Sequence, residues 1–473
     1  MSDRPRSNED LDNEDLDNEG VDALGMSVEE FRRLGYWVVD RIVERARRLD
    51  HDPVIVAGAP KELRTQLGGP LPRLPGDPVA ALELLADVGL YNKQQLDHPR
   101  YFARVPGPSS YSGILGEWLG VGFNTIAASW GGGAGPTTIE LVAIDWIRQL
   151  VEFPAGTEGI LVSGGSLANL TALVVARHAR GPGVAYLSDQ THSSVVRDLK
   201  IIGFPPEHIR IIDTGADLQL RADTVRAEAL VDLAVGLAPK IVIGTAGSTN
   251  TGRVDELPAL ADLCAEFGLW LHVDGAYGAP AALTDEGRAD LVGMERADSL
   301  VLDPHKWLFQ PLDVACVLVR EPGALERAFS MNPEYLRDVH GVGDEVDLRN
   351  RGPELTRRGR GLKLWLTFMT HGTDRIRDAI QGGIDTARYA QSRLDHDPGW
   401  SVVTPAQLGV VTFVRRDCDD RWHLDAARRL TESGFAAVSC THLGERDVLR
   451  LCTINPRTTT ADIDETLERL ASM

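Results

Sequence analysis

The chain is organised around nine consecutive residues, Ser299-Leu300-Val301-Leu302-Asp303-Pro304-His305-Lys306-Trp307. The apolar run at their start predicts a short buried strand, and Lys306 follows just beyond its end. A lysine there is a poor core residue, but it is a good amine nucleophile if desolvation or a neighbouring cation lowers its pKa. His305 borders the same position. Spacing alone fits a surface lysine equally well.

A second apolar run, residues 269–273, ends in Asp274-Gly275-Ala276-Tyr277. If both runs are parallel strands, Asp274 and Lys306 lie at the same sheet edge, where open α/β sheets bind ligands. Asp274 alone could equally be a helix N-cap. Together, an amine that forms a Schiff base and a carboxylate that pairs with a pyridinium nitrogen are what pyridoxal phosphate requires of a protein.

The composition excludes several classes of partner. A net charge of −20 argues against nucleic acid and against an anionic membrane surface. We find no signal peptide and no apolar run near the ~20 residues that span a bilayer. The five cysteines include no CxxC pair, which indicates buried thiols in a reducing cytoplasm, with neither a disulfide framework nor a metal site.

The N-terminal part predicts two regions. Residues 1–26 form an acidic tail in which residues 8–12 are repeated at 13–17, and such a composition predicts disorder. Residues 27–95 predict a helical segment that opens with the capping box Ser27-Val28-Glu29-Glu30 and has a second helix over 78–90. These helices cannot bury their apolar faces alone, so we expect them to lie on the main body or on a partner chain.

Residues 96–362 predict a large α/β domain. After an irregular stretch over 99–135 and a helix over 137–150, apolar strands alternate with helices. Strands are expected at 159–162, 184–187, 209–212, 241–243, 269–273, 300–302 and 315–319. This pattern predicts a mostly parallel seven-stranded sheet covered on both faces. A long helix from Lys363 opens a smaller α+β C-terminal domain, 363–473, with strands near 410–413 and 448–451.

Three further strand ends carry polar residues. Ser163-Gly164-Gly165-Ser166, between a strand and a helix, predicts a phosphate cup, although such turns also occur without phosphate. His192 follows the next strand and is either structural or placed to stack on a planar cofactor. Hydroxyls of Thr245-Ala246-Gly247-Ser248-Thr249 close a third strand. The combination is far more specific than any one of its members.

These segments resemble the group II pyridoxal-phosphate-dependent amino-acid decarboxylases, which include aromatic-amino-acid, glutamate and cysteine-sulfinate decarboxylases. The resemblance runs from about residue 27 to the C-terminus. Its strongest pieces are His98-Pro99-Arg100-Tyr101-Phe102, residues 163–169, 189–194 and 272–277, and Pro304-His305-Lys306-Trp307. It implies the pyridoxal-phosphate fold type I and a homodimer whose active sites lie at the subunit interface, with the N-terminal helices wrapped around the partner.

The resemblance also implies a role for individual residues. Lys306 would hold the cofactor covalently, Asp274 would pair with its ring nitrogen, and His192 would stack on one ring face. Ala276 would pack on the other ring face. The residues implied around the phosphate or its neighbours are Gly165, Ser166, Ser248, Asp303 and His305. Tyr335 matches a loop tyrosine that protonates the substrate carbon, although a packing tyrosine would look the same in the sequence.

Two departures from the family concern the substrate. Where aromatic-substrate members have aromatic pocket walls, this chain aligns Leu96, Arg104, Val105 and Ala128. A glycine-rich run, residues 131–136, replaces an acidic and proline-containing pattern. Both disfavour an aromatic substrate and favour a non-aromatic or atypical bulky one. Arg104 would favour an acidic substrate if it lay in the pocket, but it also fits a surface position.

The activity that the resemblance implies is decarboxylation of an L-amino acid to an amine and carbon dioxide. An oxygen-consuming decarboxylase that makes an aldehyde, or an aminotransferase, remains the alternative on the same fold. A non-catalytic binding protein is disfavoured because Lys306 and Asp274 are both present.

Overall fold

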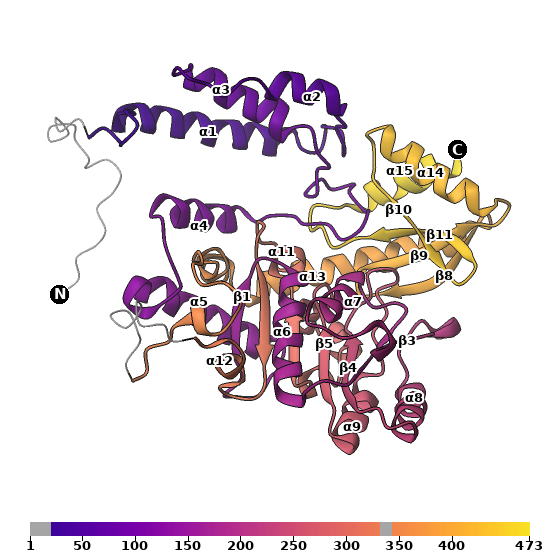
Figure 1. Cartoon of the computed structure of the whole chain (residues 1–473). Coiled ribbons are helices and arrows are strands. Elements are labelled where there is room, and N and C mark those ends of the chain that lie inside the picture. Colours follow the sequence, from indigo (N-terminus) through magenta and orange to yellow (C-terminus); the bar gives the residue numbers. More distant parts are fainter. Residues whose placement is uncertain (1–19, 332–342) are drawn as a thin grey trace. The chain divides into compact units, whose positions relative to one another are not determined.

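The computed structural model describes residues 20–331 and 343–473, which fall into two compact units. The first unit ends at Gln94 and is helical, and the second runs from Gln95 to Met473 and contains both sheets (Figure 1). Val21, in the described part of the predicted tail, forms an isolated bridge with Ser27. The rest of the predicted acidic tail, residues 1–19, lies outside the described residues.

The first unit contains the predicted N-terminal helices. Helix α1 (Val28–Arg48) begins where the sequence predicts, because the Ser27 hydroxyl accepts the Glu30 N–H at 3.1 Å. Helix α2 (Pro60–Leu67) follows, and α3 (Pro78–Leu84) continues into a π turn, η1 (Leu85–Leu90).

The second unit is built on a seven-stranded sheet. Its strands are β1 (Glu158–Val162), β2 (Val184–Ser188), β3 (Ile209–Ile212), β4 (Pro239–Thr245), β5 (Trp270–Asp274), β6 (Ser299–Leu302) and β7 (Ala315–Val319), in the order β1-β7-β6-β5-β4-β2-β3. Strand β7 is antiparallel to both of its neighbours, and the other six run the same way. Their carboxyl ends therefore gather at one edge, as the mostly parallel pattern predicts.

Helices cover both faces of this sheet because its strands are apolar on both sides. On β4, Val242 packs in one core, and Ile241 and Ile243 pack in the other. The first core includes residues of α5 (Trp130–Leu150), α8 (Ala222–Ala234) and α9 (Leu257–Phe267). The second includes residues of α6 (Gly165–Arg180), α7 (Ser193–Ile201) and α12 (Ala324–Phe329).

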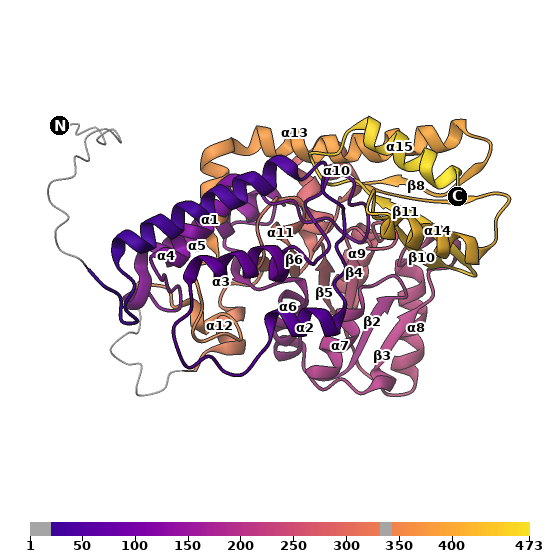
Figure 2. The same cartoon turned by 90° about the horizontal axis from the view of Figure 1, so that it is seen from above.

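The C-terminal region adds a smaller antiparallel sheet with its own core. Its strands are β8 (Trp400–Gln407), β9 (Val410–Arg415), β10 (Ser439–Leu443) and β11 (Arg446–Cys452), in the order β10-β11-β9-β8. Helices α14 (Asp420–Glu432) and α15 (Thr460–Ala471) pack beside it. Helix α13 (Gly361–His396) contacts β8 as well as α4 and α5, so it joins the two parts of the unit (Figure 2).

The expectation of irregular structure over 99–135 was wrong in two places. Helix α4 (Tyr111–Gly122) lies inside this stretch, and α5 begins at Trp130 with a short turn that the non-helical Gly133 separates from the helix predicted over 137–150. The small residues that suggested a loop serve packing here. A Cβ on Gly116 would lie 2.7 Å from the Cα of Lys363, so α4 approaches α13 where only glycine fits.

Candidate functional site

A cavity of about 420 Å³ opens at the carboxyl ends of the parallel strands. Sequence-predicted residues that line it are Gly165, Ser166, His192, Asp274, Ala276, Asp303, His305 and Lys306. These come from the ends of β1, β2, β5 and β6, which are far apart in the sequence. The structure thus brings most of the predicted site residues together.

Lys306 lies on the short helix α11 (Pro304–Trp307), directly after β6. Its Nζ lies 2.8 Å from Asp303 Oδ2. Burial lowers the pKa of Lys306, but the carboxylates of Asp303 and Asp274 outweigh burial and raise that pKa above its ordinary value. The sequence argument asked for a lowered pKa. The structure differs because the charged neighbours are anions.

His305 is anchored beside Asp303. Its Nδ1 lies 2.8 Å from the carbonyl oxygen of Val314, which can only accept, so Nδ1 carries the proton. Its Nε2 lies 3.7 Å from Asp303 Oδ2. The ring is therefore fixed at the cavity wall by the segment that leads into β7.

Asp274 closes β5 with both carboxylate oxygens bonded. Oδ1 accepts the N–H of Ala276 at 3.1 Å, and Oδ2 accepts from the Asn169 amide at 2.9 Å. The sequence argument did not assign a role to Asn169, although it quoted the motif that contains it. A polar side chain on the buried face of a helix that follows the glycine turn was the available signal.

His192 caps α7 with its ring. Nδ1 accepts the backbone N–H of Ser194 at 3.3 Å, so it carries no proton and also accepts from the Ser194 hydroxyl at 2.8 Å. The proton of the neutral ring is therefore on Nε2. The ring borders the cavity, as stacking on a planar ligand would need.

The glycine turn forms an open cup at the start of α6. Gly164 is the N-cap residue and offers no side chain, so no side chain competes for the first N–H groups of this 16-residue helix. A Cβ on Gly165 would lie 2.7 Å from Asp303 Oδ2, so a side chain there would fill the cup.

Other predicted residues lie elsewhere. Ser248 is buried and its hydroxyl pairs with Thr251 at 2.8 Å, whereas Thr245, Gly247 and Thr249 line the cavity. Tyr335 lies outside the described residues.

The four residues aligned with the substrate pocket are not among those that line the described cavity. Arg104 is exposed and its N–H bonds the Ser439 hydroxyl at 2.8 Å. Val105 packs on the main core, the carbonyl of Ala128 accepts from Arg349, and Leu96 is half-buried.

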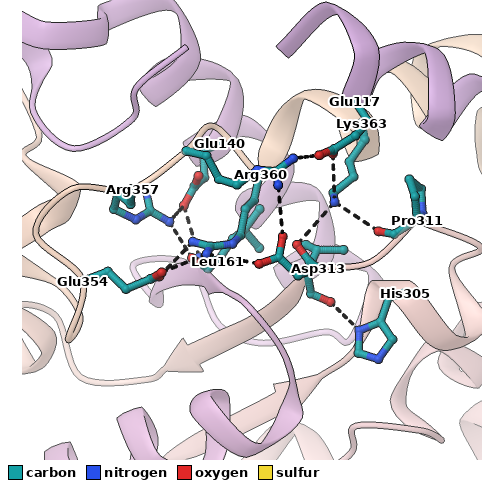
Figure 3. Close-up of polar contacts among 12 residues, drawn as sticks. Glu117, Glu140, Leu161, His305, Pro311, Asp313, Glu354, Arg357, Arg360 and Lys363 are labelled. Atoms are coloured by element: carbon teal, nitrogen blue, oxygen red, sulfur yellow. Dashed lines mark hydrogen bonds and ion pairs between the residues drawn. The ribbon is translucent and has the colours of Figure 1, made fainter. Parts of the chain in front are cut away.

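A polar network centred on the buried Lys363 lies next to the cavity residue His305 (Figure 3). Lys363 Nζ lies 3.0 Å from the carbonyl oxygen of Pro311 and 3.3 Å from that of Asp313, and it pairs with Glu117 at 3.0 Å. These bonds fix the segment that carries Leu312, which lines the cavity. Val314, two residues after Leu312, supplies the carbonyl oxygen that accepts from His305 Nδ1.

These residues fit pyridoxal phosphate. An amine and a carboxylate stand at the ends of adjacent parallel strands, an uncapped helix N-terminus offers N–H groups to a phosphate, and an imidazole borders the space between. Within residues 20–331 and 343–473, no group of three or more His, Cys, Asp or Glu could hold a metal ion. None of the helices in those ranges is long and apolar enough to cross a membrane.

Comparison with known proteins agrees with this geometry. The pyridoxal-dependent decarboxylase conserved domain matches residues 76–416. Aromatic-L-amino-acid decarboxylase of Bacillus atrophaeus is 42% identical over 464 residues, which cover 95% of this chain and 96% of that protein. Phenylacetaldehyde synthase of Petunia hybrida is 32% identical over 81% of this chain and 80% of its own length.

Solved structures resemble the whole chain. The crystal structure of Oryza sativa TDC with PLP and tryptamine has a TM-score of 0.91 and 28% identity, and covers 96% of this chain and 99% of that chain. The chain belongs to the pyridoxal-dependent decarboxylase family, and it is a carboxy-lyase that uses pyridoxal phosphate to convert an amino acid to the corresponding amine.

Proposed function

We propose that Lys306, Asp274 and His192 carry the reaction, and that the chain decarboxylates an aromatic L-amino acid. The residue roles rest on the pairing of β5 with β6. In this pair Asp274 stands opposite Val301, and β6 ends at the next residue, Leu302, shortly before Lys306. Pyridoxal phosphate, when bound, supplies the electron sink for the pair released from the Cα–carboxylate bond.

The residues of the chain position and protect that chemistry. Lys306 binds the cofactor through Nζ and gives way to the substrate amine. Asp274 holds a proton at the ring nitrogen, and His192 covers one ring face and excludes water from it. The first N–H groups of α6, with Ser166, bind the phosphate. We keep Tyr335 as the proposed proton donor to Cα, on the resemblance alone.

The residue roles are tested with Lys306→Ala, with Lys200→Ala as a control at an exposed lysine on α7. Borohydride should attach the cofactor permanently to the native protein and to Lys200→Ala, and not to Lys306→Ala. Attachment in Lys306→Ala would assign the cofactor to another lysine.

We propose an aromatic substrate because the comparisons favour it, whereas the sequence alone favoured a non-aromatic or atypical bulky one. That expectation depended on Leu96, Arg104, Val105 and Ala128, and none of them lines the described cavity. The relatives compared above are named for aromatic substrates or products, or were solved with tryptamine. Carbon dioxide release should be fastest with tyrosine, dopa, tryptophan or phenylalanine. Faster release from glutamate or cysteine sulfinate would overturn the proposal.

Aldehyde formation is the second candidate, because a relative at 32% identity is a phenylacetaldehyde synthase. The two reactions differ in the oxygen they consume and in the products they release. A simple decarboxylase consumes no oxygen and releases one amine per carbon dioxide, whereas an aldehyde synthase consumes oxygen and releases ammonia and peroxide. Measurement of oxygen uptake beside carbon dioxide release separates them.

We further propose a homodimer in the cytoplasm, with residues 27–95 as its dimerisation segment, 96–362 as the cofactor-binding domain and 363–473 as the small domain. Helix α1 exposes Phe31 and Tyr36, which supports an interface there. All five cysteines are free, as a reducing compartment allows. Light scattering should give twice the mass of one chain, and Phe31→Asp should reduce it. A monomeric native protein would contradict the proposal.

A further inference from the structure

Behind Asp274, five buried side chains form one continuous line of hydrogen bonds. The Trp270 indole nitrogen lies 2.8 Å from the Ser299 hydroxyl, which lies 2.9 Å from His272 Nδ1. His272 Nε2 lies 3.0 Å from the Asn169 amide oxygen, and the Asn169 amide nitrogen lies 2.9 Å from Asp274 Oδ2. All five residues are at most 6% exposed.

The register of the sheet explains why these residues meet. Trp270, His272 and Asp274 alternate along β5, so their side chains share one face. Ser299 stands directly opposite His272 on β6. Asn169 comes from α6, which packs on this face. The line therefore runs along the strand to the cavity.

The Asn169 amide sets the direction of the bonds in this line. Its nitrogen can only donate and faces Asp274 Oδ2, so its carbonyl oxygen faces His272 and accepts the Nε2 proton. The neutral His272 ring then accepts at Nδ1 from the Ser299 hydroxyl. The second lone pair of the Ser299 oxygen accepts the indole N–H of Trp270.

We propose that Trp270, Ser299, His272 and Asn169 form a hydrogen-bonded relay that keeps Asp274 ionised and oriented toward the ring nitrogen of the cofactor. A protonated Oδ2 would place its proton against the Asn169 N–H, and relieving this clash would require the Asn169 amide to flip and His272 to change tautomer. These four are positioning residues. The inference rests on the proposed role of Asp274.

The relay also resists protonation from outside. Burial lowers the pKa of His272 to about 4, with the charge of Asp274 acting in the opposite sense, so the ring stays neutral at neutral pH. The other charged groups that face Asp274 are Lys306 from α11 and Asp198 from α7. Among the buried polar atoms found without a partner in the described residues, none belongs to the relay.

The test compares two variants of one residue. His272→Leu removes the donor to Asn169, whereas the amide nitrogen of His272→Gln can take the place of Nε2 and restore it. We expect His272→Leu to weaken pyridoxal phosphate binding by the apoprotein about tenfold, as for loss of one buried hydrogen bond, and to shift the pH titration of the holoenzyme's visible absorption. His272→Gln should stay within about twofold of the native protein.

The matched control is Tyr186→Phe, which removes a buried hydrogen bond of 2.8 Å to Asp232 from strand β2, away from the relay. If His272→Leu does not fold, Ser299→Ala makes the same measurement from the opposite side of the ring. Affinity and titration equal to the control in the variant that folds would overturn the relay. Asp274→Ala separates the two ideas: if it also leaves cofactor affinity unchanged, the proposed role of Asp274 fails instead.

Discussion

Asp303 controls the charge of the amine that must react. It is almost fully buried, and its Oδ2 lies 2.8 Å from Lys306 Nζ. Because its charge opposes the effect of burial and raises the pKa of Lys306, Asp303→Asn should lower that pKa. Only the neutral amine attacks a carbonyl.

As the pH is raised, the rate at which the apoprotein takes up pyridoxal phosphate should therefore begin to increase at a lower pH in Asp303→Asn than in the native protein. We expect the pH–rate curve, followed by visible absorption, to move down by about one pH unit. Asp285→Asn, at a fully exposed aspartate, serves as the control. An unmoved curve would show that Asp303 does not set the charge of Lys306.

Asp198 is a second buried carboxyl, and the reaction as proposed does not use it. Burial raises the pKa of Asp198 to about 7, and the charge of Asp274 adds to this effect. The unfolded chain loses this proton near pH 4, whereas the folded chain keeps it to about pH 7. The stabilisation is complete below pH 4 and is lost as the pH rises to 7.

The variant Asp198→Asn escapes this loss because an amide does not ionise. The difference in free energy of unfolding, variant minus native, should grow by about 2–3 kcal/mol from pH 5 to pH 8. Urea denaturation at the two pH values measures it. A difference independent of pH would mean that Asp198 titrates normally in the fold.

Among single residues, the sequence could predict those that lie at or just after the carboxyl end of a strand. Lys306, Asp274 and His192 each follow an apolar strand, and parallel strands end together. Asn169 and Ser299 could not be found in this way, because their contact with His272 depends on strand register and on the rotation of α6. The spacing of residues along the chain gives no information on strand register or on the rotation of α6.

Helix α13 depends on glycine at one crossing and not at another. A Cβ on Gly361 would lie 2.6 Å from the Cα of Glu140 on α5. Because this Cα is a backbone atom, the clash is relieved only if the two helices move apart. Nothing lies within 4 Å of a Cβ on Gly382, further along the same helix. The two glycines therefore make a matched pair.

We expect Gly361→Ala to lower the free energy of unfolding by about 1–3 kcal/mol through overpacking. Gly382→Ala should raise it by up to about 1 kcal/mol, because alanine favours a helix. Thermal or urea unfolding of both variants gives the comparison. Equal effects would mean that α5 moves away from α13 without cost.

Elements with one regular pattern could be predicted, and elements built from small residues could not. The apolar strands of the large sheet lie where the sequence placed them. Helix α4 contains four glycines, which lower helix propensity and suggested a loop. Packing against α13 outweighs propensity there, and that contact joins residues some 250 positions apart.

A buried ion pair joins distant parts of the second unit. Arg357 Nη2 lies 2.6 Å from Glu140 Oε1, and both side chains are fully buried. Arg357 also donates to the carbonyl oxygens of Ala127 and Leu161, the latter one residue before the end of β1 (Figure 3). Three segments thus converge on the guanidinium of Arg357, which a fourth segment carries.

Arg357→Met should destabilise the fold by about 3–5 kcal/mol, because it leaves the Glu140 charge buried and unpaired. Adding Glu140→Met should cost less than the sum of the single changes. A double-mutant cycle in urea measures the coupling. Additive single effects would show that the pair contributes nothing beyond its separate contacts.

For the whole molecule, the alternation of strands and helices was enough to predict the fold class. The reversal of β7 could not be predicted, because an apolar run has no direction in the sequence. It results from the short return through α11, which contains no crossover helix of the length that another parallel strand would require.

The place of β7 has a consequence for synthesis on the ribosome. In the part of the chain that the structure describes, strand β1 pairs only with β7, with Glu158 opposite Val319. The hydrogen bonds of Glu158 therefore wait for a residue made 161 positions later. At about 5–20 residues per second, that delay lasts roughly 8–30 s. Through this interval the nascent chain holds an unpaired apolar strand, which is the kind of edge that chaperones bind and that aggregates at high expression. Slower induction at lower temperature should therefore raise the yield of soluble protein.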